Sequence, residues 1–175
     1  EMAPDDAADV LREVGGEKAE TLLEMMEEEE AEDVRRLMHY EDYSAGGMMT
    51  TDPVILSSES TIADALAAVR QKELAPALAA QVFVCRAPLE TPTGRLIQEL
   101  LRKPPALTLG LVVDTDSNAI PPETPLNEVV KILANYNLIA APVVDENERL
   151  LGAVTVDDVL DHLLPTNWRN TERRT

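Results

Sequence analysis

The sequence predicts a mixed α/β fold in which a short α-helical superhelix precedes two α/β units. Three observations predict it: a repeat of 24 residues near the amino end, a second repeat of 64 residues, and a strand that runs directly into a helix within residues 151–161. With 175 residues, 45% of them apolar, the chain can hold one full-sized domain or two small ones around a folded core.

The first repeat aligns residues 2–12 with residues 26–36, an offset of 24. In both copies acidic residues crowd the start and apolar residues follow at helical spacing, which is typical of amphipathic helices. Gly15 and Gly16 interrupt the first helix, and another helix is expected over about residues 17–26. A repeat of this length indicates stacked helical units, so we expect a fragment of a superhelix.

The second repeat aligns residues 51–64 with residues 115–128, an offset of 64 that holds at polar and apolar positions. Each copy predicts a short extended run, a helix cap at Ser60 or Thr124, and then an amphipathic helix. The expected helices cover 62–71 and 126–136, and the strands after them cover 82–85 and 141–144. This order predicts two related α/β units with clefts between them.

The two units differ in length near residues 97–98. Residues 94–97 match 148–151 and residues 99–101 match 158–160, so roughly five residues, about one strand, are missing from the first unit. Either a strand has truly been lost, at a severe cost to the core, or residues at this point are absent from the chain as numbered. We favour the second explanation.

The junction at residues 151–161 predicts a ligand site. Residues 151–156 are mostly apolar and β-branched, as in a buried strand, and Gly152 allows another backbone to come close. Asp157 and Asp158 then fall in the first turn of a helix, and Asp161 follows one turn later. Three carboxylates on one helix are suited to a hard cation.

The charge balance excludes some classes of partner. Thirty-three acidic and fifteen basic residues give a formal charge of −18, which disfavours nucleic acid and anionic membranes and favours multivalent cations; a merely soluble surface is the alternative explanation. The single cysteine, Cys85, is expected in the core and fits a reducing compartment. No long apolar run or signal-peptide pattern occurs, and the chain is expected to be a fragment.

Two motifs together carry a family resemblance: the linker Tyr43-Ser44-Ala45-Gly46-Gly47-Met48-Met49-Thr50 and the acidic helix from Thr155 to Asp161. With the acidic helical repeat and the paired α/β units, they make the chain resemble the cytosolic region of MgtE-type magnesium transporters. The resemblance implies a helical N domain at 1–43, a first CBS domain at 44–103, a second at 104–165, and a basic tail at 166–175. It also implies a homodimer and a transmembrane pore domain in the same full-length chain.

The resemblance further implies that Mg²⁺ binds between the N and CBS domains. Carried over residue by residue, its ligands are Asp5, Asp9, the backbone at Gly47, Asp158 and Asp161. Asp5 and Asp9 are four residues apart and share a helical face, although charges at a helix start are the simpler explanation for them. The implied function is regulatory: high Mg²⁺ closes the two domains together.

A second hypothesis keeps the CBS domains but removes the pore. The spacing Gly152-x-x-Thr155-x-x-Asp158 resembles the ribose-phosphate motif of CBS domains, so a soluble sensor of ATP or AMP would use Thr155 for phosphate and Asp158 for ribose. The protein would then be wholly cytoplasmic instead of lying at the cytoplasmic face of a membrane. An enzyme is not expected, because no nucleophile–base pair or glycine-rich phosphate loop is present. His162 is expected at the surface or in a helix cap.

Overall fold

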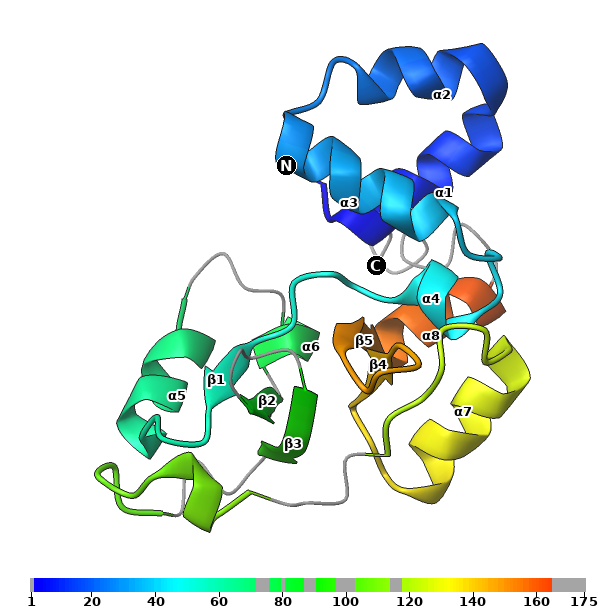
Figure 1. Cartoon of the computed structure of the whole chain (residues 1–175). Helices are drawn as coiled ribbons and strands as arrows, with labels where there is room; N and C mark the ends of the chain where they lie inside the picture. Colours follow the sequence, from blue (N-terminus) through cyan, green and yellow to red (C-terminus); the bar gives the residue numbers. More distant parts are fainter. Residues whose placement is uncertain are drawn as a thin grey trace, which may run out of the picture.

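The structure, a computed structural model, describes residues 2–71, 76–79, 81–86, 91–96, 103–113 and 118–164. Three helices form the amino-terminal part: α1 (Pro4–Val14), α2 (Gly16–Leu23) and α3 (Glu28–Met38). They stand above two α/β halves, the first on the left and the second on the right in Figure 1. The predicted fold class is confirmed.

The helices follow the 24-residue repeat. α1 and α3 begin 24 residues apart, each with acidic residues in its first turn, where carboxylates favour the exposed N–H groups. α1 ends at Val14 and is followed by the C-cap Gly15, whose φ of 64° is most easily adopted by glycine. α2 stops at Leu23, before the predicted end at residue 26, because residues 24–26 turn toward α3 and Met25 is 79% exposed.

The first half pairs three strands. β1 (Ile55–Ser57) runs parallel to β2 (Val82–Arg86), and β3 (Thr91–Leu96) is antiparallel to β2. The helices of this half are α5 (Ile62–Val69) and the short α6 (Pro76–Ala79). Cys85 of β2 is completely buried, as predicted.

The second half repeats this plan. β4 (Ala140–Val144) is antiparallel to β5 (Leu150–Thr155), and Ile120 bridges to Val143 in the parallel sense. α7 (Leu126–Asn135) comes before β4, and α8 (Val156–Leu163) follows β5 without a loop. The predicted strand-to-helix junction is therefore present, one residue earlier than expected.

The 64-residue symmetry extends into the segment that precedes each half. Each of these segments packs on the other half of the chain, not on the half that follows it. The linker helix α4 (Ala45–Met48) packs on the second half, where the Ala45 amide donates to the Thr124 carbonyl at 2.8 Å. Its counterpart η2 (Leu109–Leu111) packs on the first half, where Leu109 donates to the Ser60 carbonyl at 2.8 Å. The two halves are therefore interlocked, and the linker after the N-terminal helices is fixed to the second half.

Both predicted helix caps are wrong by one residue. α5 is capped by Thr61, not Ser60, because Asp64 returns hydrogen bonds to Thr61 in a reciprocal capping box. The N-cap of α7 is Pro125, not Thr124, and it makes no side-chain cap. Pro125 has an extended backbone, which Ser44 of the linker pairs with in an isolated bridge.

In the first half, the strand that pairs with β2 is formed by residues that precede the five-residue shortfall near residues 97–98. Leu96 pairs with Val82 as Thr155 pairs with Ala140, although the sequence alignment places Leu96 opposite Leu150. β3 thus fills the place of β5 with residues that in the second half form the turn before the strand. Residues 97–102, where the shortfall lies, are outside the described residues, so the choice between deletion and missing residues stays a prediction.

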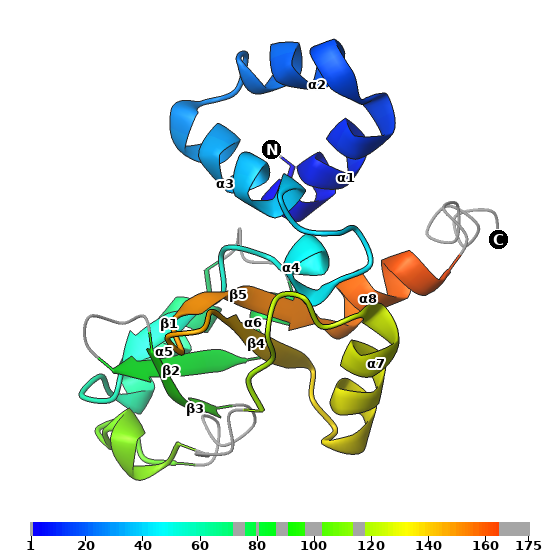
Figure 2. The ribbon, with the colours of Figure 1, turned by 45° about the vertical axis from the view of Figure 1, so that its right-hand side comes forward.

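One hydrophobic core joins the N-terminal helices to the second half. It contains Leu11 of α1, Leu37 of α3, Met48 of α4 and Val154 of β5, each at most 4% exposed. Figure 2 shows α4 between the N-terminal helices and the β5–α8 junction. Gly152 has no room for a side chain, because a Cβ there would overlap the Thr50 carbonyl, which confirms the predicted close approach of another backbone.

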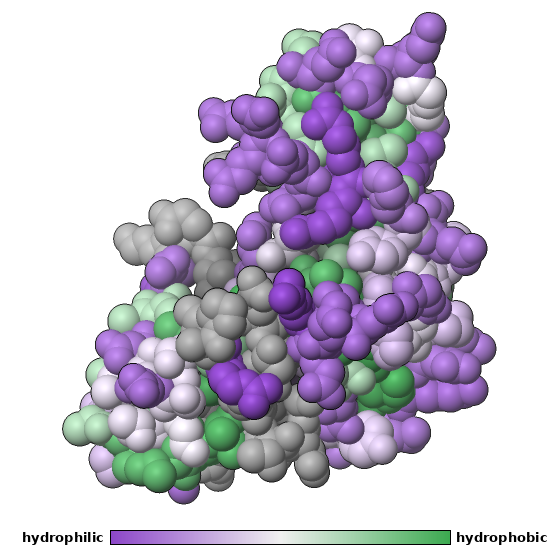
Figure 3. Space-filling model, viewed as in Figure 1, coloured by the Kyte–Doolittle hydropathy of each residue, from purple (hydrophilic) through white to green (hydrophobic). Residues whose placement is uncertain are grey.

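Within the residues that the structure describes, no helix is both long and apolar enough to cross a bilayer. On the face seen in Figure 3, hydrophilic residues cover most of the N-terminal helices. The predicted basic tail at 166–175 lies outside the described residues, and the three predicted boundaries between the four segments stay predictions.

Candidate metal site

A small hollow, open to solvent, lies where α1, α4 and α8 meet. All five residues predicted to hold Mg²⁺ line it, although they come from three segments separated by more than 100 residues at the extremes. Three further lining residues were not predicted from the sequence. Among the described residues, the lining consists of Asp5, Asp6, Asp9, Gly47, Met48, Asp158, Asp161 and His162.

Helix geometry places the acidic residues on facing surfaces. Asp5 and Asp9 lie one turn apart on α1, and Asp158 and Asp161 lie three residues apart on α8. The two helices are held together by the shared core, so their acidic faces cannot separate without exposing it. Like charges are thereby forced into one space, which favours a multivalent cation.

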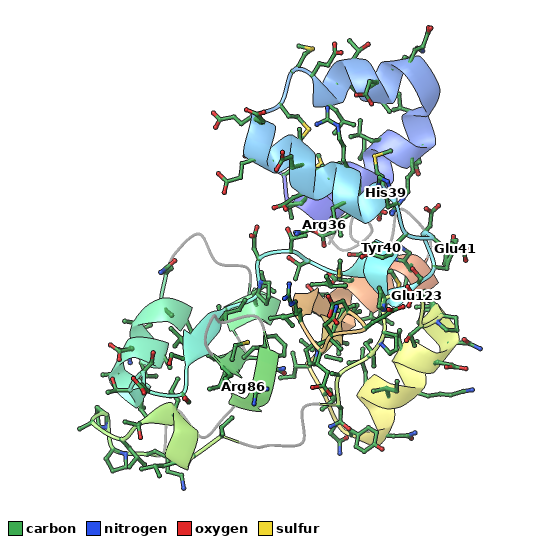
Figure 4. All side chains as sticks on the ribbon, viewed as in Figure 1. Arg36, His39, Tyr40, Glu41, Arg86 and Glu123 are labelled. Atoms are coloured by element: carbon green, nitrogen blue, oxygen red, sulfur yellow. The ribbon has the colours of Figure 1, made fainter. Side chains whose placement is uncertain are left out.

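The linker presents Gly47 to this space. The Ser44 hydroxyl caps α4 by accepting from the Gly47 amide at 3.3 Å. A Cβ at Gly47 would overlap the carbonyl of Glu41, so only glycine lets the chain fold back so tightly. Figure 4 labels Glu41 and the preceding Tyr40 where the chain leaves α3 for α4.

Asp5 is the most perturbed acid of the site. Its Oδ1 atom is buried and has no hydrogen-bond partner. Burial, and to a smaller extent the nearby Asp158 charge, raise the pKa of Asp5 from 3.8 to about 7. A buried carboxylate oxygen without a donor is a costly arrangement unless a proton or a cation completes it.

Asp158 caps α8 and also lines the hollow. Its Oδ2 accepts from the Thr155 amide at 2.9 Å, and its own amide donates to the Thr155 hydroxyl at 3.4 Å; these two bonds make the capping box of α8. The Thr155 hydroxyl also donates to Asp158 Oδ2 at 2.8 Å. Burial raises the pKa of Asp158 to about 6, while the hydrogen bonds from Thr155 lower it. Burial therefore outweighs a cap that would otherwise favour the charged form.

Asp9 lies between two basic side chains. It accepts from Arg12 at 3.0 Å, and its Oδ2 is 3.8 Å from His162 Nε2. Burial raises the pKa of Asp9, and His162 and Arg12 oppose that shift. The His162 Nδ1 atom is 3.0 Å from the Asp158 carbonyl oxygen, one turn earlier in α8, and the imidazole lines the hollow. The predicted position at the surface or in a helix cap is wrong, because the side chain is only 12% exposed and the C-cap of α8 is Leu164.

The donor set fits a hard cation that keeps part of its water. Among the described residues, no three acidic, histidine or cysteine side chains are close enough to hold an ion by themselves. Mg²⁺ commonly uses one or two carboxylates and several waters, and Asp5 Oδ1 is an oxygen in need of a partner. A partly hydrated ion between α1 and α8 is compatible with this arrangement.

The two residues predicted for nucleotide binding are engaged in the helix cap. The Thr155 side chain is buried, and its hydroxyl lies 2.7 Å from Asp157 Oδ1 and 2.8 Å from Asp158 Oδ2. The Gly-x-x-Thr-x-x-Asp spacing thus has a complete structural explanation at this helix start. A nucleotide would have to displace these contacts or add to them.

Two domain families match the chain. The MgtE intracellular N domain matches residues 1–43, and the CBS domain matches residues 97–165. The magnesium transporter MgtE of Bacillus subtilis is 31% identical over 161 residues, which are 91% of this chain and 36% of that protein. MgtE of Thermus thermophilus is 29% identical over 167 residues, again 91% of this chain and 36% of that protein. The chain spans about a third of the length of these relatives.

Solved structures agree with these matches. The soluble part of a magnesium transporter has a TM-score of 0.85 and 26% identity, covering 93% of this chain and 63% of that one. The cytosolic domain of the Mg²⁺ channel MgtE in complex with ATP has a TM-score of 0.82 and 28% identity, covering 92% of this chain and 66% of that one. The chain therefore contains an MgtE N domain and a CBS domain and is homologous to the cytosolic domain of MgtE-type magnesium transporters.

Proposed function

We propose that this chain is a regulatory Mg²⁺ sensor in which the ion binds in the hollow and holds α1 against α8. The observation that carries the proposal is that acidic residues of the first helix, Gly47 of the linker and acidic residues of the last helix line one hollow. When Mg²⁺ is low, repulsion between the acidic faces opposes the burial of the shared core and lets the N-terminal helices swing away. When Mg²⁺ is high, the ion shifts the population to the closed arrangement.

The raised pKa values of Asp5 and Asp158 support this proposal, because both show that the closed arrangement disfavours uncompensated negative charge. A divalent ion stabilises such a site without requiring protonation. The movement would control a pore that follows in the full-length chain at the cytoplasmic face of a membrane. The function is one of binding and regulation, not of catalysis.

The test combines small-angle X-ray scattering with thermal unfolding during a titration from chelator to millimolar Mg²⁺. The radius of gyration should fall and the melting temperature should rise, since the ion binds only the closed form. Asp5→Asn combined with Asp9→Asn should weaken this response and make the protein more closed in chelator, because repulsion is removed.

The repeat provides a matched control. Glu29→Gln combined with Asp33→Asn alters the equivalent positions of α3, which do not line the hollow, and should leave the Mg²⁺ response intact. If the Asp5/Asp9 variant is as open as the parent in chelator and closes normally with Mg²⁺, these residues are only helix-start charges. An unchanged radius and melting temperature in the parent would remove the sensor proposal altogether.

We further propose that the chain forms a homodimer through its CBS domains. A charge of −18 on each subunit opposes association, so cations should strengthen it. Sedimentation velocity with and without Mg²⁺ measures the effect. A monomer at tens of micromolar under both conditions would contradict this proposal.

ATP or AMP is a second candidate ligand. The similar MgtE cytosolic domain solved in complex with ATP favours it, as does the Thr155–Asp158 spacing. Because Asp158 also lines the hollow, nucleotide and Mg²⁺ would be coupled through one side chain. Calorimetry of ATP and AMP binding, with and without Mg²⁺, tests whether they compete or cooperate.

A further inference from the structure

Arg12 connects the N-terminal helices to the rim of the hollow. Its side chain is only 12% exposed. The guanidinium contacts groups from α1, the end of α3, the loop after it, and α4. These contacts are Asp9 Oδ1 at 3.0 Å, the Gly47 carbonyl at 3.4 Å, the Leu37 carbonyl at 2.7 Å, the Tyr40 carbonyl at 3.4 Å, and Asp42 Oδ1 at 2.8 Å.

The 24-residue repeat supplies a comparison for this arginine. Arg36 of α3 stands at the equivalent position and pairs with Asp33 at 2.8 Å, as Arg12 pairs with Asp9. The Arg36 side chain, labelled in Figure 4, is 46% exposed. The local ion pair is therefore common to both copies, whereas burial against the linker distinguishes Arg12.

Two of the groups that Arg12 contacts, Asp9 and Gly47, line the hollow. A guanidinium is always charged and its donors lie in a rigid fork, so it can hold two oxygens at fixed positions. The five carboxylates of the hollow make its net charge strongly negative, and one buried cation beside Asp9 offsets part of it.

We propose that Arg12 is a positioning residue of the metal site: a cation belonging to the chain that holds Asp9 and the Gly47 carbonyl in place and favours the closed arrangement before any Mg²⁺ binds. This inference rests on the proposed Mg²⁺ response and adds its regulation. Arg12 supplies part of the closure, and Mg²⁺ between Asp5 and Asp158 supplies the remainder. The chain is thus set to close at a lower Mg²⁺ concentration than its acidic residues alone would allow.

The test compares Arg12→Gln, Arg12→Lys and the parent by small-angle scattering, in chelator and in saturating Mg²⁺. Arg12→Gln should have a larger radius of gyration than the parent in chelator and a similar radius in Mg²⁺, so its Mg²⁺-induced change exceeds that of the parent. Arg12→Lys keeps the charge and should lie between the two. Arg35→Gln is the control, because Arg35 pairs at 3.4 Å with Glu20, away from the hollow.

The outcomes separate this inference from the sensor proposal. If folded Arg12→Gln is as closed as the parent in chelator while the parent responds normally to Mg²⁺, the role of Arg12 is only structural and the inference fails. If the parent does not respond to Mg²⁺, the sensor proposal fails instead. Should Arg12→Gln lose helicity by circular dichroism, Arg12→Lys decides: a radius equal to that of the parent in chelator overturns the inference, and a larger one supports it.

Discussion

Two helices of this chain, α5 and α8, begin with the same local motif in different surroundings. Thr61 and Asp64 make a reciprocal capping box at the start of α5, and Thr155 and Asp158 make the same box at the start of α8. The Thr amide donates to the Asp carboxylate at 2.8 Å in the first box and at 2.9 Å in the second. Local geometry alone does not distinguish them.

Their electrostatics are opposite. Hydrogen bonds from the Thr61 amide and hydroxyl lower the pKa of the exposed Asp64. Burial raises the pKa of Asp158 to about 6 despite equivalent bonds from Thr155. The difference arises because α1 and α4 cover the start of α8. A Thr-x-x-Asp motif thus specifies a helix start, and what packs on it decides whether it also forms a site.

The largest expected difference between the two boxes is in the Mg²⁺ response. Asp158→Asn should raise the Mg²⁺ concentration for half-maximal thermal stabilisation about tenfold or more, since losing even an outer contact of a metal ligand typically costs 10–100-fold in affinity. Asp64→Asn weakens a similar cap outside the hollow and should leave that concentration unchanged. Equal midpoints for both variants would show that Asp158 is only a cap.

The next difference concerns the threonines. Thr155→Val and Thr61→Val each remove an N-cap hydroxyl and should destabilise the fold by about 1 kcal/mol, within the usual range of roughly 0.5–2 kcal/mol. Only Thr155→Val should also weaken ATP or AMP binding, and it should leave the Mg²⁺ response in place. Urea unfolding and calorimetry measure the two effects. Nucleotide binding that survives Thr155→Val would restrict this threonine to capping.

The last difference is the pH dependence in chelator. The folded pKa values of Asp5 and Asp158, about 7 and about 6, exceed the unfolded value of 3.8. The folded state therefore binds more protons, and the contribution of both residues to stability grows as the pH falls from about 7 to about 4. Asp64 has a lowered folded pKa, so its contribution is lost as the pH falls below 3.8.

Melting temperatures measured in chelator between pH 8 and pH 5 test the direction of this pH dependence. The parent should become more stable toward pH 5, and the gain should be smaller in a variant with Asp5→Asn and Asp158→Asn. The Asp64→Asn variant should follow the parent over this range. A gain of the same size in the Asp5/Asp158 variant would place the titration elsewhere in the molecule.

The repeats predicted most of the fold because helix starts and amphipathic patterns depend on nearby residues in the sequence. The starts of α1 and α3, and of α5 and α7, follow offsets of 24 and 64 residues. The cap of α5 was misplaced because Ser60 and Thr61 are both acceptable caps, and only the reciprocal bond to Asp64 decides between them. The exchange of α4 and η2 between the halves depends on tertiary packing, which no local pattern contains.

The candidate site was only partly predictable for a related reason. Asp5, Asp9, Gly47, Asp158 and Asp161 came from the family resemblance, and their spacing alone could not bring three distant segments together. His162 could have been found from its position four residues after Asp158, which places it on the same helical face. Arg12 could not, because its partners at Leu37, Asp42 and Gly47 become neighbours only when the linker folds back.

The central claim is that a cation in the hollow holds α1 against α8, and a distance between these helices tests it directly. Spin labels at Glu13 and Leu163, both exposed, report that distance by double electron–electron resonance. Cys85 is completely buried and has a pKa raised to about 11, so it should remain unlabelled. We predict a broad distance distribution in chelator and a narrow, shorter one in millimolar Mg²⁺. In the variant with Asp5→Asn and Asp158→Asn, adding Mg²⁺ should not change the distribution. The same distribution in chelator and in Mg²⁺ would contradict the claim.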